Sequence, residues 1–176
     1  GLPWVLPSPN MPTLTTATVY PGQCLLEGTN ASEARGTTRP FEFFGAPYVD
    51  AVALREKLSG YDLPGARFRT TTFRPMFQKH AGAICHGLQL HVTDRTVYEP
   101  LATGYATVAA MSEMFDGFGW RQEAYEFVED RLAIDLLFGE MAIREQLEQG
   151  ADPVDLSRSL ERPEFDERRR RCLIYE

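Results

Sequence analysis

The chain has 176 residues, a length that suits one domain and can bury a core without disulfides or metals. Its 25 Asp and Glu against 18 Lys and Arg give a formal charge of -7, which argues against general affinity for nucleic acid and against a polybasic membrane surface. No apolar run reaches the about 18 residues that a membrane span needs.

The first twenty residues predict an extended, proline-rich connector, because prolines at this spacing prevent a helix. A domain rarely begins in this way, so we expect residues 1–20 to arrive from an upstream segment and residues 21–176 to form a single domain. No signal peptide is visible in this stretch. Its prolines are Pro3, Pro7, Pro9 and Pro12.

Periodicity and turn residues predict an α+β or α/β fold, with a small mixed sheet early and helices late. Asp94 or Thr96 is expected to cap the second helix. The expected strands are Gln23–Glu27, Arg67–Arg74 and Leu88–Thr93. The expected helices are Pro47–Leu58, Val97–Phe115, Phe127–Glu148 with a break near 135–139, and Asp152–Leu160, followed by a basic segment, Phe165–Tyr175.

Residues 27–42 form the densest polar cluster of the chain. A ligand-binding loop fits this composition, and so does a solvated loop whose hydroxyl and amide groups bond to their own backbone. The cluster contains three carboxylates, two arginines, four hydroxyls and one amide: Glu27, Glu33, Glu42, Arg35, Arg39, Thr29, Ser32, Thr37, Thr38 and Asn30.

Residues 79–94 form a second cluster, which contains all three histidines of the chain. Their spacing matches no usual set of metal ligands, and the three cysteines fit neither a zinc nor a redox pattern. Gln89 and His91 lie on one face of an expected strand, and Asp94 follows it. A sugar-binding or proton-handling wall is therefore favoured here over a metal site.

Several of these segments resemble the NamZ family of exo-β-N-acetylmuramidases, long described as a domain of unknown function. Ala34 stands where the family usually shows glycine, which matters if this position needs a positive φ. His86 and Cys172 also depart from the family. The segments that carry the resemblance are Pro7–Thr13, Glu27–Asn30, Ser32–Glu42, Gly45–Pro47, His91–Arg95 and the ending from Phe165 to Tyr175.

The resemblance implies that this region follows an N-terminal Rossmann-like domain that the chain lacks, with the active site in the cleft between the two. It implies a secreted or periplasmic glycosidase that releases N-acetylmuramic acid from the non-reducing end of peptidoglycan fragments. Its expected partners are muramyl saccharides and the N-terminal domain. No cofactor is expected, and the histidine and cysteine spacings predict no metal.

Glycoside hydrolysis commonly uses a carboxylic acid and a second group as nucleophile or base, so Glu27, Glu33 and Glu42 are the catalytic candidates. Arg35 and Arg39 can hold the lactyl carboxylate of muramic acid bidentately. The other expected substrate-binding residues are Asn30, Thr37, Thr38, Gln89, His91 and Asp94. Two alternatives stay open: a non-catalytic saccharide-binding domain, and a metal-dependent hydrolase built on the histidines.

Overall fold

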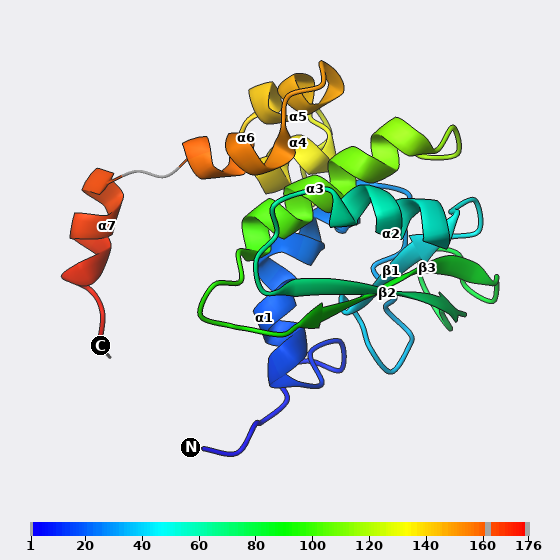
Figure 1. Ribbon diagram of the computed structural model, residues 1–176, viewed down its shortest axis with the longest axis horizontal. Coiled ribbons are helices and arrows are strands. Elements are labelled where there is room, and N and C mark those ends of the chain that lie inside the picture. Colours follow the sequence, from blue (N-terminus) through cyan, green and yellow to red (C-terminus); the bar gives the residue numbers. More distant parts are fainter. Residues whose placement is uncertain (1, 161–162, 175–176) are drawn as a thin grey trace.

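The computed structural model describes residues 2–160 and 163–174, so Gly1 and Tyr175 of the expected terminal segments lie outside the described part. A small sheet lies below α2 and α3, and α4 to α6 lie above α3 (Figure 1). In chain order the elements are α1 (Leu14–Gln23), the 3-10 helix η1 (Cys24–Gly28), β1 (Phe43–Ala46), α2 (Ala51–Ser59), β2 (Ala66–Phe73), β3 (Cys85–Val92), α3 (Pro100–Met114), α4 (Ala133–Phe138), α5 (Met141–Glu148), α6 (Pro153–Ser159) and α7 (Pro163–Arg170).

The strands pair in the order β1-β3-β2, and both pairings are antiparallel, so the fold is α+β and the expected mixed sheet is corrected. The two strands expected in this region are confirmed as β2 and β3, although β3 begins three residues earlier than predicted. Strand β1 escaped prediction because it has only four residues, one of them glycine.

One face of the sheet packs into the core. Leu88 and Leu90 of β3 are fully buried there, and the ring of Phe44 meets that of Phe68 edge to face, with centroids 6.3 Å apart. Side chains alternate along a strand, so the neighbouring positions of β2 and β3 point to the opposite face.

Helix α3 is the centre of the core. Every residue from Ala102 to Met111 is buried, because α1, α2 and α6 pack around this helix. The predicted helix Val97–Phe115 is confirmed but starts at Pro100, and Val97 and Leu101 are 46% and 39% exposed. A helix buried on all sides has no single apolar stripe, so the sequence pattern does not mark its start.

The expected extended connector is wrong from Leu14 onward, where α1 begins. Thr13 caps this helix by accepting a hydrogen bond from the Thr16 backbone, and Pro21 falls only in the last turns. The predicted strand Gln23–Glu27 is also wrong, since the chain continues directly from α1 into η1. Short apolar runs do not distinguish a strand from a buried helical turn.

The later helices follow the prediction more closely. The predicted break within Phe127–Glu148 is confirmed at Gly139, which has φ +89°, but the residues before Ala133 are not helical. Asp50 caps α2, which starts later than predicted, and Glu99 precedes α3 in place of the expected capping residues. Within the described residues no helix is long and apolar enough to span a membrane.

Helices α1 and α3 approach each other through a pair of glycines. A Cβ added at Gly104 would lie 2.3 Å from the backbone oxygen of Gly22, and one added at Gly22 would lie 1.8 Å from the oxygen of Pro100. Because backbone atoms oppose each other here, a side chain can be accommodated only if the helices move apart.

We expect Gly104→Ala to destabilise the protein by about 2 kcal/mol, since overpacking exceeds the gain in helix propensity. The melting temperature should fall by roughly 4–8 °C, measured by thermal denaturation. Gly60→Ala is the control, because that residue ends α2 with only the Lys57 oxygen, at 3.2 Å, near an added Cβ. Equal effects of the two substitutions would contradict the close-contact explanation.

Candidate functional site

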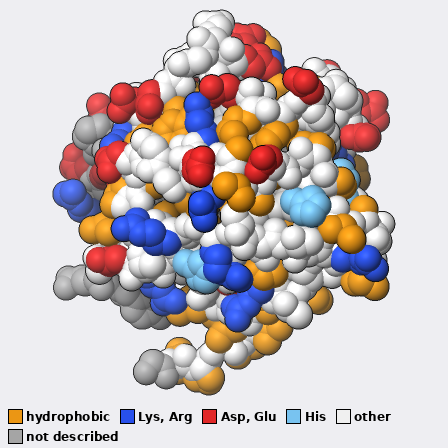
Figure 2. All heavy atoms as spheres, turned by 45° about the vertical axis from the view of Figure 1, so that its right-hand side comes forward, with side chains coloured by type: hydrophobic (Ala, Val, Ile, Leu, Met, Phe, Trp, Pro, Cys, Tyr) orange, Lys and Arg blue, Asp and Glu red, His pale blue; other side chains and the backbone are white. Residues whose placement is uncertain are grey.

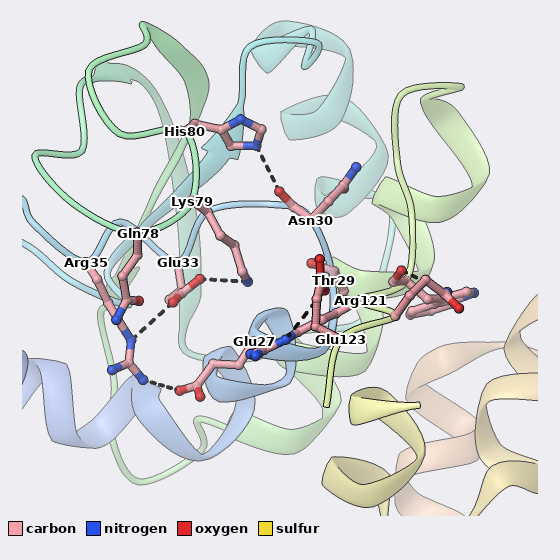
Figure 3. Close-up of a pocket in the computed structure, with 12 residues that line it drawn as sticks. Glu27, Thr29, Asn30, Glu33, Arg35, Gln78, Lys79, His80, Arg121 and Glu123 are labelled. Atoms are coloured by element: carbon pink, nitrogen blue, oxygen red, sulfur yellow. Dashed lines mark hydrogen bonds and ion pairs between the residues drawn. The ribbon is translucent and has the colours of Figure 1, made fainter. Parts of the chain in front are cut away.

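A hollow of about 620 Å³ lies where residues 27–35 meet two loops from later in the chain (Figure 3). We call it the loop pocket. Its volume is within the range of small-molecule sites. It is lined by Glu27, Thr29, Asn30, Glu33, Arg35, Gln78, Lys79, His80, Trp120, Arg121, Gln122 and Glu123.

Arg35 lies between two carboxylates on one side of the pocket (Figure 3). One terminal nitrogen donates to Glu27 Oε1, and Nε lies 3.1 Å from Glu33 Oε1. The other oxygen of Glu27 accepts a hydrogen bond from the Tyr125 hydroxyl at 3.1 Å. Burial opposes the charge of Arg35, but Glu27 and Glu33 outweigh it and raise the pKa of the guanidinium.

Lys79 neutralises the second oxygen of Glu33. Its ammonium donates to Glu33 Oε2 at 3.0 Å, to the backbone oxygen of Leu26 at 2.7 Å and to that of Ala31 at 3.0 Å. All three hydrogens of the ammonium therefore have acceptors. Burial lowers the pKa of Lys79, and the charge of Glu33 opposes this shift without cancelling it.

The side chain of Asn30 joins the first pocket segment to residues 117–119. Its Oδ1 accepts from the Tyr48 hydroxyl at 2.6 Å and the Gly119 amide at 3.1 Å, and its Nδ2 donates to the Gly117 oxygen at 2.8 Å. The predicted substrate-binding amide thus uses these groups to hold the pocket wall together. Arg121 N also donates to the Gly28 oxygen, at 2.9 Å.

Four residues without the freedom of glycine adopt positive φ in the segments around the pocket. Ala34 and Phe41 have φ 60° and 62°, and Gln78 and His80 have φ 63° and 57°. Such conformations cost of order 1–3 kcal/mol each and gather at functional sites.

His80 Nε2 lies 2.8 Å from the Asn30 carbonyl. Because a carbonyl oxygen can only accept, Nε2 carries the proton of this hydrogen bond.

The remaining residues predicted in the first cluster lie outside the lining of the pocket. Glu42 is only 2% exposed; it accepts from Thr13 and Thr16 of the α1 start and pairs with Arg39 at 3.3 Å. Thr37 bonds within its own turn, to the Ala34 oxygen at 2.7 Å. Thr38 is exposed.

The predicted sugar-binding residues of the second cluster do not line the pocket either. Gln89 accepts from Arg69 at 2.6 Å across the sheet, and His91 pairs in register with Arg67. Asp94 accepts two hydrogen bonds from Thr96, which lower the pKa of its carboxyl. The structure therefore separates these residues from Glu27 and Glu33.

Besides Gln122 and Glu123, five lining residues outside the first cluster had no assigned role in sequence reasoning. Two of them, Lys79 and His80, open the histidine cluster, and their neighbours in sequence gave no sign of contact with residues 26–33. Trp120 lies in an aromatic-rich segment, which gives no signal of a pocket rim in the sequence. These residues are Gln78, Lys79, His80, Trp120 and Arg121.

The three histidines do not converge. His80 lines the pocket, while His86 and His91 belong to β3. Within the described residues no group of three or more His, Cys, Asp or Glu side chains lies close enough to hold a metal ion. This arrangement gives no support to the alternative of a hydrolase built on the histidines.

The sequence matches the family described as "Exo-beta-N-acetylmuramidase NamZ, C-terminal" over residues 18–175. The chain belongs to this family. It is 42% identical over 176 residues to the peptidoglycan beta-N-acetylmuramidase NamZ of Bacillus subtilis strain 168, and the match covers 99% of this chain but 41% of that protein. The chain therefore spans less than half of the length of this relative.

Two crystal structures of DUF1343 family proteins from Bacteroides fragilis share the fold of this NamZ-family chain. The first has a TM-score of 0.77 at 23% identity, and the match covers 99% of this chain and 46% of the chain in that crystal structure. The second has a TM-score of 0.59 at 24% identity, with 97% and 43% covered. At this level of identity the likeness shows the fold alone.

We expect Lys79→Met to destabilise the protein by about 3–5 kcal/mol, because it leaves Glu33 and two backbone oxygens without their common donor. Lys57→Met is the matched control, since Lys57 forms a surface ion pair with Glu113 at 2.7 Å and should lose less than about 1 kcal/mol. Urea denaturation measures both. A loss at Lys79 no larger than at Lys57 would show that this ammonium does not hold the loop.

We expect Ala34→Gly to change stability by less than about 1 kcal/mol. Relief of the positive φ should stabilise the protein by about 1–2 kcal/mol. Two effects oppose it: a buried methyl group is lost, and glycine raises the entropy of the unfolded chain, which costs about 0.4–1 kcal/mol of stability. Ala34→Val should cost more than about 2 kcal/mol, since a β-branched residue tolerates this backbone poorly and the site is packed by Phe73 and Cys85. Equal urea midpoints for the two variants would refute the strained backbone.

Proposed function

We propose that this chain is the C-terminal part of an exo-β-N-acetylmuramidase and that the loop pocket forms one wall of its saccharide site. The observation that carries the proposal is the array of Glu27, Arg35, Glu33 and Lys79, which lines a pocket formed in part by residues 27–35 of the loop that carries the resemblance. In the complete enzyme the substrate would be the non-reducing N-acetylmuramyl end of peptidoglycan fragments. We also propose that the enzyme acts outside the cytoplasm, as a secreted or periplasmic protein.

Among the three candidate carboxylates, Glu27 is the one we propose to contact the saccharide. It is 13% exposed and lines the pocket, and its partners there are Arg35 and Tyr125. Glu33 is 3% exposed and has cations at both oxygens, so its proposed role is to position Arg35 and Lys79. Glu42 lies beneath the loop, where it is bonded to the start of α1 and serves the fold.

Recognition of the lactyl carboxylate needs a cation that is not already neutralised. Arg35 is flanked by two carboxylates, and this opposes binding of a third. Arg121 lines the same pocket, and its ion pair with the exposed Glu123 is 3.8 Å long. We therefore propose Arg121 as the pocket cation for the lactyl group. Arg39 is 46% exposed but is paired with Glu42 at 3.3 Å, so it is the weaker candidate at the loop surface.

A non-catalytic, saccharide-binding role is the second candidate. The close pairing of Glu27 and Glu33 with cations favours it, since such carboxylates can serve to shape a binding wall. Kinetics separate the two roles: a binding wall affects KM, whereas a group that acts in the transition state affects kcat.

We expect Glu27→Gln, in the full-length enzyme, to lower kcat for a chromogenic β-N-acetylmuraminide by about 100-fold or more, the usual scale of general acid-base catalysis. Glu123→Gln is the control, because Glu123 is an exposed carboxylate on the rim of the same pocket and should leave kcat within about twofold. A rise in KM with unchanged kcat for Glu27→Gln would leave only the binding role.

The present chain alone should turn over little substrate, since one wall cannot enclose a sugar.

A further inference from the structure

The face of the sheet that points away from the core carries two neighbouring arginines, Arg67 and Arg69. The register places Arg67 opposite His91 and Arg69 opposite Gln89. These four side chains lie on the face opposite to Phe68, Leu88 and Leu90, which pack into the core. We call the face that carries Arg67, Arg69, Gln89 and His91 the outer sheet face.

The arginines of this face have no carboxylate partner in the part of the chain that the structure describes. Within the described residues neither Arg67 nor Arg69 takes part in an ion pair; Arg69 donates to Gln89, and Arg67 donates to the backbone oxygen of Ala66. Both are exposed, whereas the pocket cations Arg35 and Lys79 are each paired. An unpaired arginine keeps its donors available for a planar anion.

This distribution of charge is unexpected in a protein with a net charge of -7. Figure 2 shows acidic side chains gathered toward the top, on the side of α4 to α6, and Lys and Arg side chains gathered lower, at the level of the sheet. A local excess of one sign focuses the field and draws ligands of the opposite sign. The outer sheet face is thus suited to an anion, although the protein as a whole is not.

The end of the same face leads to the loop that forms the pocket. Phe43 of β1 pairs in register with Gln89, and its ring lies 6.0 Å from that of Phe73. Ala34, one residue before Arg35, packs against Phe73. A glycan chain that extended from the pocket over this loop would therefore reach Phe43 first and the two arginines next.

We infer that the outer sheet face binds the remainder of a carboxylated glycan strand whose terminal sugar occupies the loop pocket. The inference rests on the proposed function for the identity of the polymer. Arg67 and Arg69 are two residues apart on β2, so their Cα atoms lie about 6.6 Å apart at the usual rise per residue of a β-strand. They receive carboxylates carried by sugars beyond the terminal one, while Gln89 and His91 supply further hydrogen-bonding groups. The face is polar and cationic, and this fits an anionic saccharide better than an apolar protein surface.

The test compares Arg67→Gln/Arg69→Gln with Arg168→Gln/Arg169→Gln, which removes the same charge from exposed residues of α7. The probes are peptide-free peptidoglycan glycan strands, chitin oligosaccharides, which lack the carboxylates, and a teichoic acid, which carries phosphates. We expect the present chain to bind the glycan strands and not chitin, with an affinity that falls as salt rises. The sheet variant should bind about five- to tenfold more weakly, and the α7 variant as wild type.

Failure of binding by the wild type, equal binding of chitin, equal affinity of the sheet variant, or stronger binding of the teichoic acid would each overturn the inference. In the full-length enzyme the sheet variant should keep the wild-type kcat/KM for a chromogenic monosaccharide and lose activity on long strands. An equal loss on both substrates would also overturn it, since the face would then serve the pocket or the rest of the enzyme. The proposed function has its own test at Glu27, on the monosaccharide, so the two can fail separately.

Discussion

The burial of Glu33 is the constraint on which the arrangement of this protein most depends. A carboxylate that is 3% exposed has to be matched by cations, and here Arg35 and Lys79 approach one oxygen each. Lys79 comes from a loop 46 residues further along the chain, so its ion pair joins two distant segments. Its two additional bonds, to the oxygens of Leu26 and Ala31, fix the path of the chain between η1 and the loop.

The elements that could be predicted from the sequence are those whose local pattern agrees with their environment. Strand β2 alternates because one of its faces is open, and α6 begins at an aspartate that caps it. Helix α3 was predicted as well, but its contact with α1 was not, since that contact depends on Gly22 and Gly104, which are 82 positions apart and carry no local signal. Prolines near α1 also suggested an extended chain, whereas packing against α3 favours the helix.

The part of the candidate site that lies in one polar segment could be predicted from the sequence, whereas its partners from distant segments could not. Residues 27–35 are polar, close in sequence and similar to a known family, so Glu27, Glu33 and Arg35 could be found without a structure. Which of them pair is decided by geometry, and the partner Lys79 belongs to a cluster in which the histidines drew attention. Gln89 and His91 were correctly assigned to one face of a strand, but that face is not the wall of the loop pocket.

The amide of Asn30 has a consequence for how this wall can respond to a ligand. Because its oxygen and nitrogen are both bonded to residues 117–119 or to Tyr48, the segments on either side cannot separate without breaking three hydrogen bonds at once. Such a wall behaves as a rigid body, so a ligand of the loop pocket would meet a preformed surface, with little entropy left to lose. Under the proposed function, any closure around a saccharide would then have to come from movement of another part of the enzyme, and selectivity that depends on closure would have its origin there.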